Sequence, residues 1–230
     1  HAVEQAQGRR FLAMEFVDGE PLSALIPEAG FPTDRLVALA VPLVDAIAAA
    51  HQRGVTHRDV KPANVVIARD GHLKVLDFGV AILAPERDAQ KRTLLQTWGA
   101  TIQQGAAGTL AYMSPEQVGG GPTDPRSDLF SLGAVLFEMA TGHRPFAAAK
   151  TPVELIAAIV RDRPESPTRW KPDLPDPLVR VINACLEKHP ERRPASAGAV
   201  REVLRGLQAD LEAGRTPPLR SIAVLAFTDL

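Results

Sequence analysis

The feature that most constrains this chain is the stretch His57-Arg58-Asp59-Val60-Lys61-Pro62-Ala63-Asn64, which is followed shortly by Asp77-Phe78-Gly79. It places a carboxylate, an ammonium group and an amide close together on one loop, with a second carboxylate further along the chain. Between the two motifs, residues 64–68 and 72–76 have strand patterns, and Asp70-Gly71 is a strong hairpin signal. A tight hairpin brings Asn64 at its start close to Asp77 at its end. The sequence therefore predicts one polar site built from both motifs.

These motifs resemble those of a known protein family. The stretch at residues 57–64 differs from the catalytic loop of protein kinases, His-Arg-Asp-Leu-x-x-x-Asn, only by Val60 in place of Leu. The later Ser114-Pro115-Glu116 is similar to the substrate-docking segment of that family, with Ser114 where Ala is commonest. A lone Asp-Phe-Gly is ordinary turn chemistry, so the ordered set of motifs is what counts. The sequence resembles the bacterial, eukaryotic-like serine/threonine protein kinases.

The resemblance implies an α+β, protein-kinase-like fold with a mainly helical large lobe, short β-hairpins and most of the small lobe missing. Its implied chemistry is phosphoryl transfer from ATP to serine or threonine hydroxyls of protein substrates. Asp59 would position the attacking hydroxyl and take its proton, and Lys61 would offset charge on the transferring phosphate. Asn64 and Asp77 would ligate Mg²⁺, or Mn²⁺ as an alternative, through oxygen atoms. A lysine at position 61 also resembles the serine/threonine branch.

The resemblance also implies a nucleotide pocket. Met14 is the expected gatekeeper, and the hinge that binds the adenine edge is expected at residues 15–17, which include Glu15 and Val17. Val66 is expected to form the apolar floor beneath adenine.

Regulation is expected at the loop over residues 80–107, which corresponds to the activation loop. Arg58, a cation beside the catalytic Asp, is the expected docking point for a phosphate there. We expect Thr97 or Thr101 to be autophosphorylated, with a dimer as a further expectation during that step. Thr109 is expected to bond both Asp59 and Lys61 and to shape the pocket for a serine or threonine acceptor.

The remaining residues implied by the resemblance are structural. His57 and Phe78 are expected to stack in the core, and Gly79 lets the backbone turn after Asp77. Asp128 is expected to hold the backbone of the catalytic loop. Glu116 and Arg193 are expected to form a buried ion pair.

Composition excludes several other classes of protein. The 230 residues are 45% hydrophobic and 23% charged, as in an ordinary globular protein with a core. A net charge of −1 gives no reason to expect nucleic acid or an anionic membrane surface as a partner. The single cysteine, Cys185, excludes an intrachain disulfide and a cysteine-rich metal site. Without a signal peptide or a membrane-spanning apolar run, a cytoplasmic location and no membrane contact are expected for this segment, while the full-length protein could be membrane-associated.

Local patterns predict the remaining elements. A strand is expected over residues 10–17, and helices are expected over 20–29, 33–53, 128–141, 151–161, 178–187 and 195–213. The proline-rich residues 162–177 are expected to lack regular structure. The predicted organisation is the end of the small lobe and the hinge at 1–18, the large lobe at 19–213, a linker at 214–219, and a further domain or tail at 220–230.

The sequence begins with His1 rather than Met, and a strand pattern starts again at residues 221–227. The glycine-rich phosphate loop of protein kinases and its partner lysine do not occur in it. We therefore expect a missing upstream segment, and we expect the chain as given to bind ATP weakly and to transfer phosphate poorly or not at all.

Two alternatives stay open. A pseudokinase would use the fold as a scaffold, against which the intact Asp59, Lys61, Asn64 and Asp77 argue. A small-molecule phosphotransferase would share the same acidic and amide groups but would lack the docking segment that resembles residues 108–116.

Overall fold

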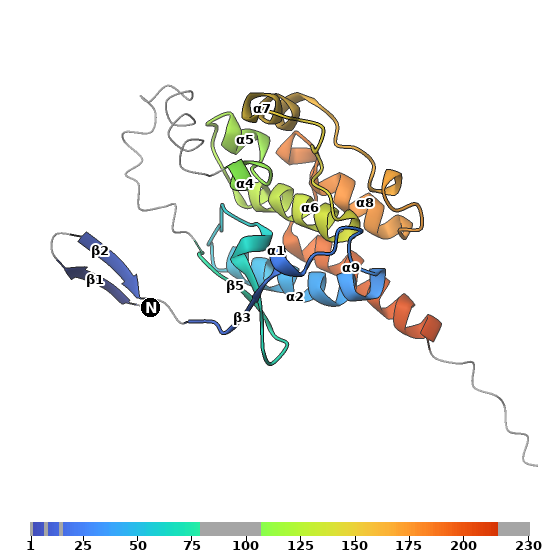
Figure 1. Cartoon of the computed structure of the whole chain (residues 1–230), viewed down its shortest axis with the longest axis horizontal. Coiled ribbons are helices and arrows are strands. Elements are labelled where there is room, and N and C mark those ends of the chain that lie inside the picture. Colours follow the sequence, from blue (N-terminus) through green and yellow to red (C-terminus); the bar gives the residue numbers. More distant parts are fainter. Residues whose placement is uncertain (1, 7–8, 14–15, 79–106, 216–230) are drawn as a thin grey trace, which may run out of the picture.

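The computed structural model of the chain describes residues 2–6, 9–13, 16–78 and 107–215 (Figure 1). Strands β1 (Ala2–Ala6) and β2 (Arg9–Ala13) form one antiparallel pair. A second antiparallel sheet has the order β3 (Gly19–Pro21), β4 (Val65–Ala68) and β5 (Leu73–Val75). The other described elements are helices. This mainly helical architecture with short β-hairpins confirms the predicted fold class.

The hairpin of β4 and β5 lies where its turn signal predicts. Gly71 has a φ of +85°, a conformation that glycine adopts without steric cost, and the Asp70 carboxylate accepts a hydrogen bond of 2.9 Å from the His72 backbone N–H. The ladder continues past β5, because the Leu76 N–H donates to the Asn64 carbonyl at 2.8 Å. Asn64 therefore lies opposite the residue that precedes Asp77, as the site requires.

Helix α6 (Pro125–Thr141) forms the centre of the helical part and is buried on almost every side. The Asp124 side chain caps its first turn by accepting a hydrogen bond from the Arg126 N–H. Gly142 ends it with a φ of +74°. A Cβ atom at this position would lie 1.9 Å from the carbonyl oxygen of Glu28, so the close approach of that loop requires glycine.

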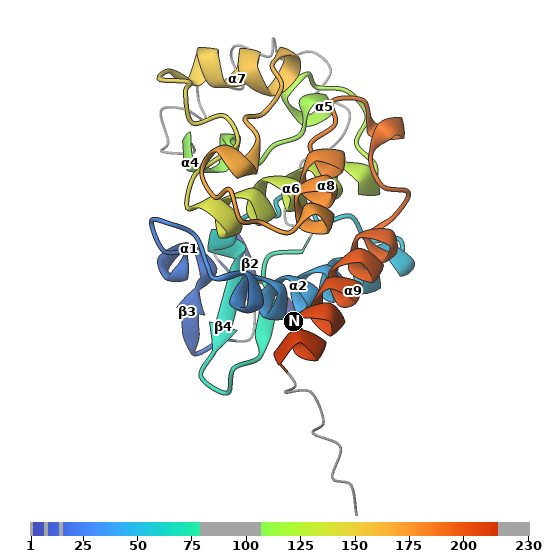
Figure 2. The same ribbon diagram turned by 90° about the vertical axis from the view of Figure 1, so that its right-hand side faces the viewer.

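The other helices cover α6 from two sides. Helices α2 (Thr33–Gln52) and α9 (Ala197–Arg215) run along each other on one side (Figures 1 and 2). Their contact combines apolar packing with ion pairs from Asp45 to Arg201 at 3.5 Å and to Arg205 at 2.9 Å. Helix α8 (Asp176–Cys185) packs on α6. The short helices α4 (Ala107–Leu110) and α5 (Pro115–Val118) lie with α7 (Pro152–Arg161) on the other side (Figures 1 and 2).

Some predicted boundaries are wrong. The helix expected over residues 20–29 is only α1 (Leu22–Leu25), because the preceding residues pair with β4 as strand β3 and Gly30 adopts a φ of +72°. The strand expected over 10–17 ends at Ala13. Helix α9 continues through Gly214 to Arg215, past the expected end at residue 213. Short 3₁₀ turns occur at η1 (Pro62–Asn64), η3 (Pro167–Arg169) and η4 (Pro190–Arg192), the second of them within the segment expected to be irregular.

Across the described ranges, no helix is both long and apolar enough to cross a membrane.

Candidate active site

The backbone of the loop at residues 57–61 is held by a side chain from α6. Asp128 is fully buried, and its Oδ2 accepts a hydrogen bond from the His57 N–H at 2.8 Å while its Oδ1 accepts one from the Arg58 N–H at 2.7 Å. The His51 imidazole Nε2 lies 2.8 Å from the same Oδ2. Arg58 has a φ of +68°, which is uncommon for a residue other than glycine. Asp128 therefore fixes a strained turn directly before Asp59.

Asp59 lies at the centre of a small polar cluster. Its Oδ2 accepts hydrogen bonds from Lys61 Nζ at 2.8 Å and from Asn64 Nδ2 at 2.9 Å. Lys61 Nζ also donates to Thr109 Oγ1 at 2.9 Å, which brings in a residue from α4. Thr109 was expected to bond both Asp59 and Lys61, but within the described residues its hydroxyl reaches Asp59 only through Lys61. The Asp59 side chain is 34% exposed, so one oxygen is held while the carboxylate stays accessible to solvent.

The hydrogen bond between the Leu76 N–H and the Asn64 carbonyl brings Asn64 close in space to Asp77, the residue after Leu76. Since Asn64 Nδ2 donates both to the Asp59 carboxylate and to the Asp59 carbonyl at 2.9 Å, the Asn64 Oδ1 is left as an acceptor. Asp77 has a φ of +59°, and its carboxylate has no hydrogen-bond partner within the part of the chain that the structure describes. Amide and carboxylate oxygens are the donors that Mg²⁺ prefers, so the pair fits that ion.

Two oxygen donors alone would not fill the coordination shell of a metal ion. In the described residues there is no group of three or more His, Cys, Asp or Glu side chains that could hold a metal ion. Mg²⁺ in nucleotide sites commonly takes one or two protein oxygens and completes its shell with phosphate oxygens and water. The chemistry of Asn64 and Asp77 therefore fits a metal ion whose shell is completed by phosphate oxygens and water.

Two of the residues expected to contact adenine are described. Val66 is 7% exposed on β4, opposite Pro21 of β3, and Val17 is half-buried just before β3. Five other predicted site residues lie outside the described ranges: Met14, Glu15, Gly79, Thr97 and Thr101.

The contact between His57 and Phe78 differs from the expected stack. The ring centroids are 4.6 Å apart, but the ring planes are tilted by 51°. His57 is buried and its Nε2 lies 2.8 Å from the Leu76 carbonyl oxygen, whereas Phe78 is 38% exposed. Phe78 therefore meets the imidazole at an angle, at the rim of the core. The contact joins the two motifs, but the expectation of a stacked, buried pair was wrong.

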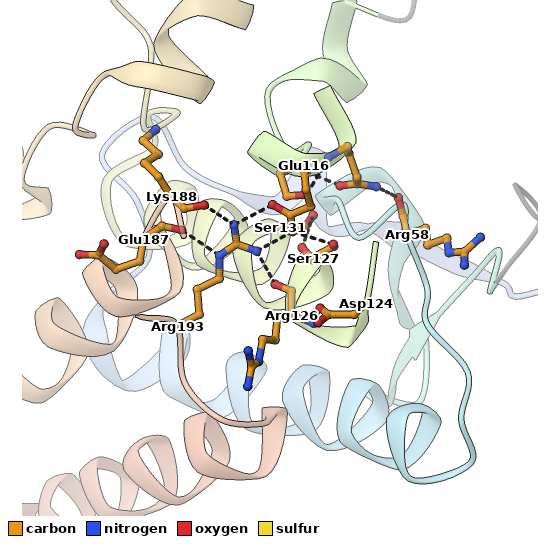
Figure 3. A network of polar contacts seen from close by, with 11 residues as sticks. Arg58, Glu116, Asp124, Arg126, Ser127, Ser131, Glu187, Lys188 and Arg193 are labelled. Atoms are coloured by element: carbon orange, nitrogen blue, oxygen red, sulfur yellow. Dashed lines mark hydrogen bonds and ion pairs between the residues drawn. The ribbon is translucent and has the colours of Figure 1, made fainter. Parts of the chain in front are cut away.

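Glu116 and Arg193 form the expected ion pair (Figure 3). Arg193 Nη1 donates to Glu116 Oε1 at 2.7 Å, and Nη2 donates to Oε2 at 2.8 Å, an arrangement with both oxygens engaged. Its remaining N–H groups donate to the carbonyls of Arg126, Glu187 and Lys188. The guanidinium group therefore has all five donors satisfied although its side chain is fully buried.

The protonation of Glu116 follows from the same contacts. Burial acts to raise the pKa of Glu116, but the hydrogen bonds from Arg193 and Ser127 outweigh it and hold the pKa below its ordinary value. The pair is therefore ionised at neutral pH and joins α5 to the segment before α9.

Sequence reasoning missed two contacts of this region. The Tyr112 hydroxyl donates to the Glu138 carboxylate, and burial together with that carboxylate raises the pKa of Tyr112. Gln117 forms a capping box with Ser114 at the start of α5 and donates to the Arg58 carbonyl at 2.7 Å. The pattern Ser-x-x-Gln at residues 114–117 is a recognised start signal for a helix and could have revealed the cap. Nothing in the pattern indicates the contact with Arg58.

Comparison with known proteins agrees with this geometry. The family described as "Protein kinase domain" matches residues 1–204. The "Probable serine/threonine-protein kinase PkwA" of Thermomonospora curvata is 41% identical over 209 residues, which cover 90% of this chain and 25% of that protein. The serine/threonine-protein kinase PknB of Mycolicibacterium smegmatis is 36% identical over 193 residues, covering 83% of this chain and 29% of that protein.

A "Probable serine/threonine-protein kinase" of Clostridium acetobutylicum is 34% identical over 199 residues, which are 86% of this chain and 28% of that protein. The chain thus spans between 25% and 29% of the length of these three relatives. The family match covers most of the chain, including the loop of Asp59, the docking segment and Arg193. The chain therefore belongs to the protein kinase domain family.

Proposed function

We propose that this chain carries the catalytic groups of a serine/threonine protein kinase, which transfers the γ-phosphate of ATP to serine and threonine hydroxyls of proteins. The observation that carries the proposal is the cluster in which Lys61 and Asn64 both bond Asp59 Oδ2 while Thr109 bonds Lys61. Similarity to bacterial proteins named as serine/threonine-protein kinases supports it.

We assign to Asp59 the role of orienting the acceptor hydroxyl. Because its Oδ2 receives two hydrogen bonds, the side chain is fixed, and the other oxygen remains to accept the proton of a serine or threonine. Lys61 Nζ supplies a positive charge beside that carboxylate, where the phosphate would pass. ATP would supply the phosphoryl group, and Asn64 and Asp77 would hold Mg²⁺, which would offset the negative charge of the phosphates.

Control by phosphorylation is part of the proposal. Arg58 Nε is buried and has no hydrogen-bond partner within the described residues, so the side chain has unused capacity for an anion. A phosphate on Thr97 or Thr101 is the proposed partner, placed there by autophosphorylation between two copies of the protein. Phosphopeptide mapping of active protein tests this step, and finding neither threonine modified would contradict it.

The direct test of the reaction is transfer of labelled phosphate. The protein is expressed from its complete reading frame and incubated with Mg-ATP and a protein substrate that offers serine, threonine and tyrosine. We expect phosphoserine and phosphothreonine in the product. Label found only on tyrosine, or only on a small-molecule alcohol, would refute the proposed substrate class.

A further inference from the structure

Among the described residues, two helices begin with a capping box, and the side chain that closes the box is an amide in one and a carboxylate in the other. At the start of α7, Glu154 Oε2 accepts hydrogen bonds from the Thr151 N–H at 3.3 Å and from the Lys150 N–H at 2.7 Å. At the start of α5, Gln117 Oε1 accepts one from the Ser114 N–H at 3.0 Å. A carboxylate and an amide serve equally well here, because the box needs only an acceptor oxygen. The cap alone therefore does not explain an amide at position 117.

The second end of the Gln117 amide makes a contact that a carboxylate could not make. Its Nε2 donates a hydrogen bond of 2.7 Å to the carbonyl oxygen of Arg58, which is 59 residues earlier in the sequence. The acceptor role of Oε1 in the cap fixes which end of the amide points at Arg58. Glutamate at this position would face the carbonyl oxygen with a second acceptor, which is repulsive.

The carbonyl that Gln117 holds belongs to the peptide bond between Arg58 and Asp59. Arg58 adopts a left-handed φ of +68°, and its N–H is already held by Asp128 Oδ1. The N–H of the same peptide bond, from Asp59, donates to His57 Nδ1 at 3.3 Å. The plane of this peptide bond sets the direction in which the Asp59 side chain leaves the backbone. Gln117 is thus the contact from the docking segment that fixes that plane.

We propose that Gln117 is a positioning residue, which orients Asp59 by hydrogen-bonding the Arg58 carbonyl and thereby couples the docking segment to the catalytic loop; this rests on the proposed function. Figure 3 shows Arg58 at one end of the same polar network in which Arg193 holds Glu116. Glu116 and Gln117 are adjacent on α5, so the ion pair anchors the helix while the amide reaches the loop.

The experiment replaces the amide by a carboxylate. In Gln117→Glu the cap keeps its acceptor and the contact with Arg58 is lost. Phosphate transfer by the protein from its complete reading frame is expected to fall about tenfold in kcat, with KM for ATP changed less than about twofold. The matched control is Glu154→Gln, the reverse exchange in the other capping box, for which kcat is expected to stay within about twofold of the parent.

A second pair of variants separates the lost donor from the added charge. Gln117→Met removes the donor without introducing a carboxylate, and Glu154→Met removes the same acceptor from the other box. Gln117→Met is expected to lower kcat as Gln117→Glu does, while Glu154→Met lowers only the thermal midpoint. This pair also decides the matter if Gln117→Glu does not fold. Equal kcat in Gln117→Met and Glu154→Met would overturn the proposal.

Hydrogen exchange gives a readout that does not depend on transfer. Backbone amides of residues 57–61 are expected to exchange about tenfold faster in Gln117→Met than in Glu154→Met, while α6 stays protected equally in both. This holds even if the parent transfers no phosphate, so a failure of the proposed function is distinguished from a failure of this inference. Unchanged exchange at residues 57–61, or faster exchange spread over α6 as well, would overturn the role of Gln117.

Discussion

Helix α6 and the catalytic loop at residues 57–64 achieve order in opposite ways. Helix α6 satisfies its own backbone, begins at the Asp124 cap, ends at Gly142 and buries apolar side chains on all sides. The loop has few backbone hydrogen bonds of its own and contains Arg58 at a positive φ. It is held instead by side chains that are far away in sequence, Asp128 and Gln117.

The difference separates stability from positioning. Damage to the buried supports of the helical part should lower the free energy of unfolding. Damage to the contacts that hold the loop should lower phosphate transfer more than stability, since the loop contributes little to the apolar core. Asp128 belongs to both regions, because it is a residue of α6 that binds the loop.

The largest stability effect is expected for Arg193→Ala. Removing the guanidinium leaves Glu116 as an uncompensated charge with three carbonyls unpaired, which typically costs about 3–5 kcal/mol. Chemical denaturation measures the change in the free energy of unfolding. The control is Arg192→Ala at the exposed residue next to Arg193, and its free energy of unfolding should stay within about 0.5 kcal/mol of the parent. Equal effects of the two substitutions would show that the pair does not support the fold.

Asp128→Asn tests the junction between the two regions. The amide keeps the shape, but one of the two backbone N–H donors of the loop then meets an NH₂ group, at a cost of about 1.5–3 kcal/mol. Expressed as free energies, the loss in the rate of phosphate transfer should exceed the loss in stability. Asp124→Asn is the control, because asparagine caps a helix as well as aspartate does. This substitution should change the free energy of unfolding by only ~0.3 kcal/mol. A loss of stability in Asp128→Asn with transfer unchanged would contradict the proposed role in positioning.

An effect confined to alkaline pH is expected from a titration in the helical part. Lys188 Nζ donates to the Ile159 carbonyl at 2.6 Å and lies 4.3 Å from the centre of the Phe146 ring. Burial lowers the pKa of Lys188 to about 8, against an ordinary value of 10.5, although Asp162 acts in the opposite direction. Between these two values the unfolded chain binds more protons than the folded one, so raising the pH through this window favours folding.

Urea unfolding of the parent and of Lys188→Met checks that sign. The stability of the parent should rise relative to the variant as the pH goes from about 8 toward 10.5. Parallel curves for the two proteins would mean that Lys188 keeps its ordinary pKa in the folded state.

Elements with a strong local pattern could be predicted from sequence. The apolar run of α6 with Gly142 after it, and the Asp70-Gly71 turn between β4 and β5, depend on neighbouring residues only, and both lie as expected. The helix expected over residues 20–29 failed because pairing of Gly19–Pro21 with β4 outweighs local helix preference. The last helix, expected to end at residue 213, continues through Gly214 to Arg215.

Part of the candidate site could also be predicted from the sequence. The motif at residues 57–64 identified Asp59, Lys61 and Asn64 as site residues. The family resemblance predicted that Asp128 holds the loop and that Glu116 pairs with Arg193. The contact from Gln117 to Arg58 could not be predicted, because it joins residues 59 positions apart through a side chain whose local pattern indicates only a cap. The tilt and exposure of Phe78 depend likewise on packing in three dimensions.

The most direct test of the proposed reaction compares the parent with Asp59→Asn, both from the complete reading frame. ATP binding and phosphate transfer to a serine/threonine protein substrate are followed together in the presence of Mg²⁺. We predict that the variant still binds ATP, while transfer falls by about a hundredfold or more, because the acceptor hydroxyl loses its oriented base. Transfer at the parental rate in Asp59→Asn would contradict the proposed role of Asp59. A parent that binds ATP and transfers nothing would contradict the proposed activity and would indicate a pseudokinase scaffold.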